Sequence, residues 1–184
     1  LSSFKNNKSL DKILNFTSVG VEWKRKNMLK SVKVISQLNK KGYNSKLTIV
    51  GATPPKNFHK PHYLELVPFL NKTNKSEFNK LKKIYLNSTF FILLSKAEAF
   101  GLVLQEANSY GLPLILNNIG GMKFAASNNH TIFVNKNLSP EKISLKIIKL
   151  IKKPQKYKKY CHNSYNSSLN KSWDVISKKL KKII

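Results

Sequence analysis

The feature that most restricts the fold is a short run, Thr89 to Leu94 (TFFILL), whose last five residues are all apolar. A strand with one face in water alternates apolar and polar residues, whereas a strand covered on both faces is apolar throughout. Because doubly covered strands belong mostly to parallel sheets flanked by helices, this run predicts the central strand of a parallel α/β sheet. The chain contains no apolar run of about eighteen residues, so no membrane-spanning helix is expected.

The rest of the chain alternates between strand and helix patterns. In the expected helices apolar residues recur three or four positions apart, and glycine follows several of the expected elements. The expected strands are residues 12–19, 46–50, 63–67, 89–94, 113–116 and 131–134, and the expected helices are residues 27–41, 74–87, 102–110, 156–169 and 172–184, with a further one that begins at Ser139. This order predicts a Rossmann-like, doubly wound α/β fold with a parallel sheet of about six strands and C-terminal helices.

Two of the expected helix starts carry capping residues. Asn74, with Glu77 three positions later, predicts a reciprocal pair in which each side chain bonds the backbone of the other residue. Ser139, Pro140 and Glu141 supply a cap, a proline for the first turn and an acid near the positive helix end. Both segments are therefore expected to begin helices at these positions.

The length of 184 residues suits one domain with a single core. We expect residues 1–11 to be a linker and residues 172–184 to form a terminal helix. Cys161 is the one cysteine and has no partner for an internal disulfide, and the sequence has no cysteine or histidine cluster with metal-site spacing. A reducing, cytoplasmic environment and a site without metal are therefore expected.

The formal net charge of +26, taken alone, predicts a polyanionic partner such as nucleic acid or anionic lipid. However, Arg25 is the only arginine among the 34 basic residues, and the chain also contains 21 asparagines, a composition typical of AT-rich codons. The lysines are spread along the whole chain, and base readout and phosphate clamping favour arginine. We therefore expect no nucleic-acid partner, and only a weak attraction to anionic membrane surfaces.

The candidate site lies after the central strand, because doubly wound sheets bind ligands at the carboxyl ends of their strands. There the sequence reads SKAEAFGLVLQEA from Ser95, with Glu98 in a loop and Glu106 inside the following helix. The N–H groups of Phe100 to Val103 lie at the start of that helix, where they lack intrahelical partners and favour an anion. The two carboxylates can accept hydrogen bonds from the hydroxyls of a ribose and a hexose.

This E-x7-E segment, filled as EAFGLVLQE, resembles the signature of GT-B glycosyltransferases of family 4, the glycosyl transferases group 1. Other segments are similar to that family in the same order: residues 16–26 (FTSVGVEWKRK), residues 47–51 (LTIVG), residues 111–115 (GLPLI) with Gly120-Gly121, and residues 172–174 (SWD). The resemblance covers nearly the whole chain. It implies the C-terminal, donor-binding domain of a GT-B enzyme.

The resemblance also implies a role for each residue of the site. Arg25 and Lys26 would bind the donor diphosphate and, with Glu98, act in catalysis; Glu98 would contact the transferred sugar. Glu106 would hold the ribose hydroxyls. The implied donor-binding residues are Gly20, Val21, Arg25, Lys26, Glu98, Ala99, Phe100, Gly101, Leu102, Val103, Glu106, Gly120 and Gly121. The implied donor is a UDP- or GDP-linked sugar, with no metal and no other cofactor.

The reaction implied by the resemblance is transfer of a hexosyl group to an acceptor with retention of configuration. The family's acceptor-binding N-terminal domain is expected to be absent from this chain, so this piece is expected to bind the donor without transferring sugar. The expected acceptor is a glycan or a lipid-linked saccharide of the cell envelope, met in the cytoplasm or at the inner face of the membrane.

Two positions depart from the family pattern. Asn27 stands where the family commonly has glycine, and Met122-Lys123 stands where it often has Pro-Glu. A degenerate, inactive domain of this fold is therefore one alternative, and a basic nucleic-acid-binding domain is another. A Rossmann oxidoreductase is excluded, because it needs Gly-x-Gly-x-x-Gly after the first strand and Gly20 stands there alone.

Overall fold

Six strands form one sheet in the computed structural model, which describes residues 10, 12–98, 101–122 and 126–169. The strand order is β3-β2-β1-β4-β5-β6, and each pairing of neighbouring strands is parallel. The expected doubly wound fold is therefore confirmed. The strands are β1 Leu14–Val19, β2 Ser45–Val50, β3 Leu64–Val67, β4 Phe90–Leu93, β5 Leu114–Asn117 and β6 Thr131–Val134.

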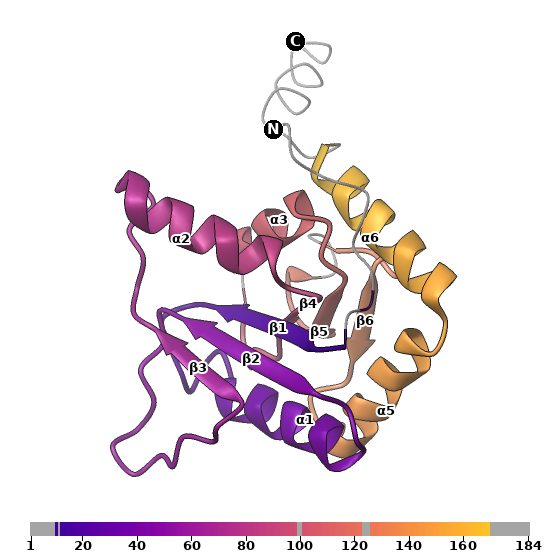
Figure 1. Ribbon diagram of the computed structural model, residues 1–184, viewed down its shortest axis with the longest axis horizontal. Coiled ribbons are helices and arrows are strands. Elements are labelled where there is room, and N and C mark those ends of the chain that lie inside the picture. The colour runs from indigo at the N-terminus through magenta and orange to yellow at the C-terminus, as the bar shows by residue number, and fades with distance from the viewer. Residues whose placement is uncertain (1–9, 11, 99–100, 123–125, 170–184) are drawn as a thin grey trace.

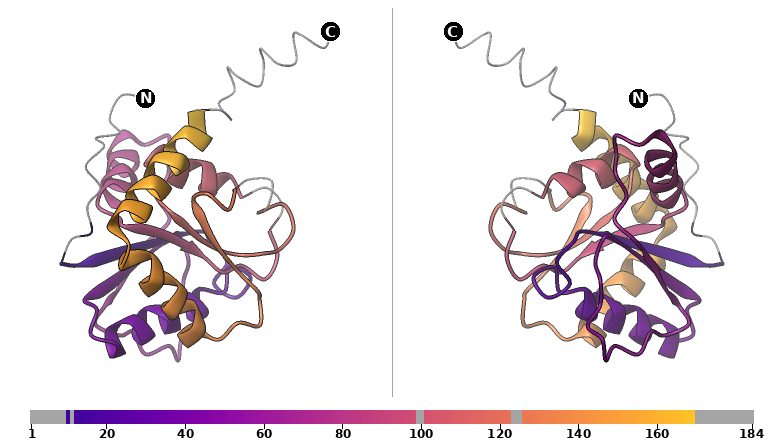
Figure 2. Two further views of the ribbon diagram at one scale, coloured as in Figure 1. Left: turned by 90° about the vertical axis from the view of Figure 1, so that its right-hand side faces the viewer. Right: turned by 90° about the vertical axis from the view of Figure 1, so that its left-hand side faces the viewer.

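Helices cover the sheet on both sides, with α1 and α5 below it and α2 and α3 above it in Figure 1. α1 packs beside α5, and α3 packs beside α6, which runs with α5 along one side of the molecule (Figure 2). Among the described residues, every helix is too short or too polar to cross a bilayer. The helices are α1 Met28–Lys40, α2 Lys75–Leu86, α3 Leu102–Ser109, α5 Pro140–Ile151 and α6 Pro154–Leu169.

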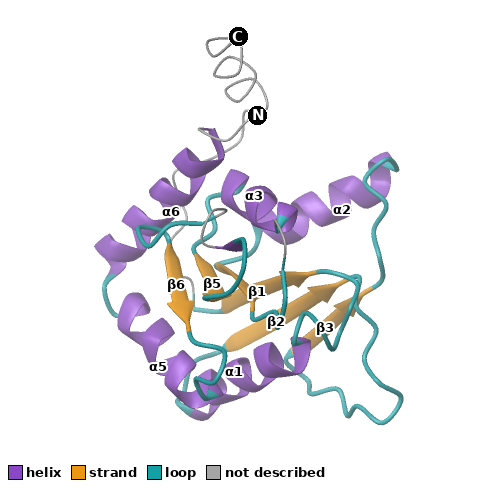
Figure 3. Ribbon diagram, turned by 180° about the vertical axis from the view of Figure 1, so that it is seen from behind, coloured by secondary structure: helices purple, strands orange, loops and turns teal. Residues whose placement is uncertain are grey.

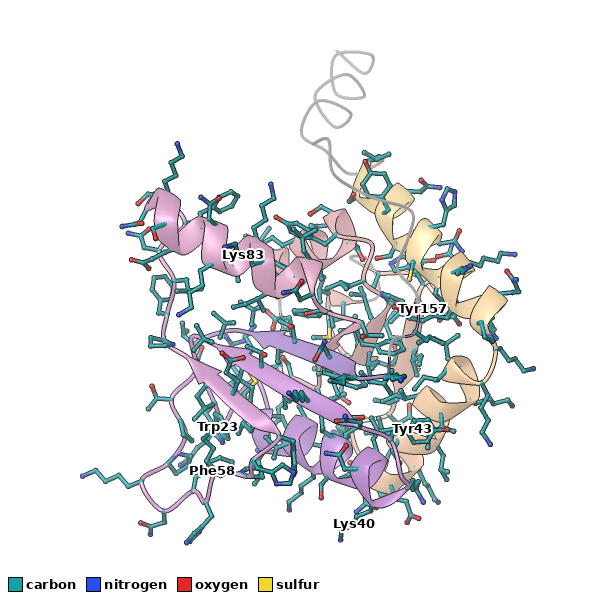
Figure 4. All side chains as sticks on the ribbon, in the orientation of Figure 1. Trp23, Lys40, Tyr43, Phe58, Lys83 and Tyr157 are labelled. Atoms are coloured by element: carbon teal, nitrogen blue, oxygen red, sulfur yellow. The ribbon has the colours of Figure 1, made fainter. Side chains whose placement is uncertain are left out.

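The core is centred on β4, whose four residues are all fully buried. The Phe90 ring stacks on Phe16 of β1 with a centroid distance of 5.2 Å, and meets Tyr157 of α6 edge to face at 5.4 Å. The Tyr157 hydroxyl donates to the carbonyl of Thr89 over 3.0 Å, so its one polar atom is satisfied inside the core (Figure 4). The all-apolar strand of the sequence is thus the centre of the sheet, as predicted.

The start of α2 confirms half of the predicted capping pair. The Asn74 side chain accepts from the amides of Ser76 at 2.9 Å and Glu77 at 3.2 Å. The Glu77 carboxylate, however, accepts from the amide of Asn71 at 2.6 Å, so the predicted return bond to Asn74 is wrong. The amide of Asn74 instead donates to the Asn71 carbonyl at 3.1 Å, because the preceding turn folds back on the helix start.

Most other element ends lie within two residues of expectation. Ser139 caps α5 by accepting from the Lys142 amide at 3.2 Å, as predicted. The expected helix from residue 156 begins at Pro154 instead, which fits the preference of proline for a first helical turn. The expected terminal helix of residues 172–184, and all but Leu10 of the expected linker, lie outside the described residues.

The burial of β4 predicts a large effect of a cavity there. Ile92 is fully buried, so Ile92→Ala should lower the free energy of unfolding in urea by about 2–5 kcal/mol. Phe69→Ala is the control, because Phe69 is 66% exposed and its truncation should change stability by less than about 0.5 kcal/mol. Equal effects of the two substitutions would contradict this account of the core.

Candidate functional site

The sheet has one point at which its winding reverses, between β1 and β4. The connections after β1 lead outward to β2 and β3, whereas those after β4 lead outward to β5 and β6. At such a switch point the loops leaving the two central strands diverge and leave a crevice for a ligand. Residues 20–27 leave β1 and residues 94–98 leave β4, so both predicted site segments start at this point; Figure 3 draws these residues in teal.

The two segments meet in an ion pair. The Lys26 ammonium donates to Oε2 of Glu98, and both side chains are more than nine-tenths buried, at 8% and 9% exposure. The Ser95 hydroxyl lies 3.4 Å from the same carboxylate oxygen. Two residues that are 72 positions apart in the sequence, and that the resemblance placed in one site, therefore do lie together.

Arg25 lies at the edge of this pair, and its guanidinium bonds other residues of the protein. Its Nε donates to Glu22 at 2.8 Å and its Nη1 donates to the Ala97 carbonyl at 3.1 Å, while Nη1 lies 3.9 Å from Glu98. The hydrogen bond with Glu22 raises the pKa of Arg25, and the same bond lowers the pKa of Glu22. Since the Arg25 carbonyl also accepts from the Lys96 amide at 2.8 Å, this residue joins the β1 and β4 loops. Diphosphate binding by Arg25 stays a prediction.

Gly120 packs directly on the backbone of Glu98. At its φ of +48° a side chain is strained, and a Cβ atom there would lie 2.6 Å from the Glu98 carbonyl oxygen. Gly101, with φ +58°, is the N-cap of α3, and a Cβ there would lie 2.9 Å from Leu104. Gly120 thus allows the loops after β4 and β5 to touch, whereas Gly101 allows the turn into α3. Gly121 follows in the same turn, whereas Ala99 and Phe100 lie outside the described residues.

The remaining predicted residues lie in the loop after β1 and at the start of α3. Gly20 lies against the Lys26 stem, since a Cβ on Gly20 would be 3.0 Å from Lys26 Cε. Val21, after β1, is 55% exposed, and Leu102, the first residue of α3, is 75% exposed. Val103 is half-buried. The predicted residues therefore include exposed apolar side chains as well as a buried charge pair.

Glu106 has partners of its own, distinct from those of Glu98. The ammonium of Lys72, in the loop after β3, donates to Oε1 of Glu106, and the Tyr85 hydroxyl of α2 donates to Oε2 at 3.2 Å. Burial raises the pKa of Tyr85 well above its ordinary value, and the negative charge of Glu106 adds to the effect. The two carboxylates are therefore held by different parts of the chain, Glu98 by the loop after β1 and Glu106 by α2 and the loop after β3.

The sequence did not single out Lys72 or Tyr85. Lys72 is one of many lysines, and composition hides it. Tyr85 is fully buried on the inner face of α2, where its ring stacks on Tyr110 at 5.1 Å, so its pattern is that of a core residue. Only the pairing of their polar atoms with Glu106 marks them as part of the site.

The departures from the family pattern have a structural reading. Asn27 has φ +54°, in the left-handed region that glycine favours and that asparagine tolerates better than most other residues. Met122 is fully buried in the core, and Lys123 lies outside the described residues. Asparagine at position 27 therefore preserves the backbone turn that a glycine would make.

Trp23 is a packing residue of the β1 loop. It is 7% exposed, and its ring meets Phe58 edge to face at 5.0 Å. Figure 4 labels both side chains. Phe58 belongs to the long loop between β2 and β3, so this contact fixes two loops at the edge of the sheet. Across the described residues, no group of three or more His, Cys, Asp or Glu side chains is placed to hold a metal.

The fold and this site define the class: a Rossmann-like α/β domain with a buried acid–lysine pair at its switch point. The chain belongs to the family described as glycosyl transferases group 1, whose model matches residues 2–167. This membership confirms the glycosyltransferase assignment made from the E-x7-E segment.

Solved structures of glycosyltransferases share the fold. WaaG, a glycosyltransferase involved in lipopolysaccharide biosynthesis, superposes with a TM-score of 0.72 at 18% identity, over 98% of this chain and 49% of that one. The pneumococcal O-GlcNAc transferase GtfA, in complex with UDP and GlcNAc, gives 0.70 at 20% identity, over 95% of this chain and 38% of that one. The GtfA/B complex gives 0.73 at 19% identity, over 96% and 36%. The chain thus spans half or less of these proteins, and no curated protein matches it.

The burial of the Lys26–Glu98 pair predicts an asymmetric response to substitution. Lys26→Met leaves the Glu98 carboxylate buried without its cation and should cost about 3–5 kcal/mol in urea unfolding. Adding Glu98→Gln to Lys26→Met should restore most of that loss. Lys72→Met is the control, since Lys72 is 47% exposed in its pair with Glu106 and should cost less than about 1 kcal/mol. A Lys26→Met effect no larger than the control would be evidence against a buried pair.

Tyr85 predicts a pH dependence above neutrality. Its pKa is raised in the folded protein, so its contribution to stability is fully present below about pH 10 and is lost as the pH rises through the folded value. Stability of the native sequence should therefore fall more steeply above pH 10 than that of Tyr85→Phe. Urea unfolding at pH 9, 10 and 11 measures how the free energy of unfolding of each protein falls with pH. Parallel curves for the native sequence and Tyr85→Phe would contradict a raised pKa of Tyr85.

Proposed function

We propose that this chain binds a nucleotide-diphospho-sugar, a UDP- or GDP-linked hexose, and serves as the donor-binding half of a retaining hexosyltransferase. The observation that carries the proposal is the buried Lys26–Glu98 pair at the switch point of the sheet, beside the start of α3. Membership of the glycosyl transferases group 1 supports the same conclusion.

The leaving group of such a reaction is a nucleoside diphosphate, on which negative charge grows as the glycosidic bond breaks. Preorganised cations and backbone N–H groups stabilise charge that develops in a low-dielectric site. Lys26 supplies a nearly buried ammonium, and the first turn of α3 supplies amides without intrahelical partners. In the proposed function both stabilise the departing diphosphate, so no metal is required.

The two acids divide the recognition of hydroxyl groups. In the proposed function Glu98, fixed between Lys26 and Gly120, contacts the transferred sugar. Glu106, 30% exposed and reached from the β3 side, accepts hydrogen bonds from the ribose. Lys72 and Tyr85 hold the Glu106 carboxylate in place for that contact.

Transfer needs an acceptor site, and we place it on a second domain. This chain covers 49% of WaaG and 38% of GtfA, so about half or more of each of those proteins lies outside the match. A glycan or lipid-linked saccharide held by that second domain would face the exposed Val21 and Leu102 side chains. The isolated chain is then a donor-binding unit without transfer activity.

Calorimetry with UDP, GDP and ADP tests the donor site. One of the first two should bind, and Glu106→Gln should weaken it by about tenfold or more, because a hydrogen bond to a charged carboxylate contributes about 1.5–3 kcal/mol. ADP should bind more weakly than the preferred nucleotide.

The matched control is Glu141→Gln. Glu141 is also paired with a lysine, Lys41, which directly follows α1 near the amino end of β2 and thus at the opposite edge of the sheet. This substitution changes the net charge as Glu106→Gln does, and it should leave affinity unchanged. Absence of binding for all three nucleotides, or equal weakening by both substitutions, would overturn the proposed function.

A further inference from the structure

A single side chain of β5 holds the turn by which the chain leaves β4. Asn117, the last residue of β5, is 1% exposed, and its Nδ2 donates to the carbonyls of Leu94 at 2.8 Å and Ser95 at 2.9 Å. The β4–β5 ladder ends one position earlier, at Leu93 and Leu116. Because a carbonyl oxygen only accepts, the nitrogen of the carboxamide must face both of these groups. The side chain thus extends the pairing of the two strands into irregular backbone.

The restraints continue without a gap from this turn to Glu98. The Lys96 amide donates to the Arg25 carbonyl at 2.8 Å, and the Ala97 carbonyl accepts from the Arg25 guanidinium at 3.1 Å. The Glu98 carbonyl lies against Gly120, where a methyl group would approach to 2.6 Å. Every residue from Leu94 to Glu98 is therefore held by the loop after β1 or by the end of β5 and the loop that follows it.

The bonds of Asn117 are unusual for a residue that serves packing alone. Asn108, also fully buried, accepts from the Ser164 hydroxyl at 2.9 Å and so joins two regular helices, α3 and α6. Asn117 instead bonds two successive carbonyls of a loop, four and three residues before the acid of the site. The same loop brings the Ser95 hydroxyl to 3.4 Å from the Glu98 carboxylate.

We propose that Asn117 is a positioning residue: it fixes the turn after β4 so that Glu98 is held against Lys26 and toward the sugar of the donor. Its effect on the backbone follows from the hydrogen bonds alone. Its consequence for the sugar rests on the proposed function.

Amide hydrogen exchange measured by NMR, without added nucleotide, tests the positioning. The reporters are the Lys96 amide, in the held loop, and the Phe91 amide, which donates to Pro113 within the sheet at 3.1 Å. In Asn117→Leu, exchange at Lys96 should rise at least tenfold more than exchange at Phe91. Asn117→Ser is the second variant, because a hydroxyl is too short to reach both carbonyls yet does not crowd the core.

The matched control is Asn108→Leu, which removes a buried carboxamide away from the loop. In that variant the two reporter amides should change together, as expected when only global stability is lowered. Parallel changes at Lys96 and Phe91 in both Asn117 variants would overturn the proposal, and so would no change at Lys96.

Calorimetry then compares UDP-glucose with UDP, and GDP-mannose with GDP. If Glu98 contacts the sugar, Asn117→Ser should weaken the sugar-linked nucleotide at least fivefold more than the bare diphosphate, whereas Asn108→Leu should weaken neither selectively. Equal weakening of the nucleotide sugar and the bare diphosphate would contradict the inference that Asn117 positions Glu98 for the sugar. If the native sequence binds none of the four, the proposed function fails, while the exchange experiment still decides whether Asn117 positions the loop.

Discussion

The complete burial of β4 is the constraint on which the rest of the structure depends. A strand covered on both faces has no room for a polar side chain, so polar chemistry can begin only where the strand ends. Leu94 is still fully buried, and Ser95 is the first polar residue after it. Because the sheet reverses its winding beside this strand, the same burial that stabilises the core also places the first polar residues in the crevice.

In a chain with eight acids and 34 basic residues, a lysine near a glutamate carries little information. Each of the six described glutamates accepts a hydrogen bond, four of them from a lysine or arginine side chain. Burial separates the pairs, since Lys26–Glu98 is 8% and 9% exposed whereas Lys41–Glu141 is 30% and 59% exposed. A buried pair contributes little net stability because both charges lose water, so a gain in stability does not by itself account for a buried pair at the switch point.

The sequence predicted the features that depend on local pattern, and missed those that depend on register and long-range contact. The apolar run predicted β4, and Ser139 predicted the start of α5. The predicted bond from Glu77 to the Asn74 backbone was wrong because Glu77 accepts from Asn71, which lies in a turn before the helix. The expected strand of residues 113–116 ended before Asn117, whose place in the fold follows from the pairing of Leu93 with Leu116, which no local pattern contains.

Arg25 shows that composition and geometry carry different information about one residue. As the only arginine in the chain it was the natural candidate for a phosphate fork; its guanidinium engages Glu22 and the Ala97 carbonyl, and phosphate binding by Arg25 stays a prediction. For Lys26 the composition is uninformative, because it is one lysine among many, but the structure shows that it is the cation buried beside Glu98. In the proposed function a diphosphate would thus meet a charge that the loops already hold in place, so binding would lose little free energy to the ordering of a long side chain.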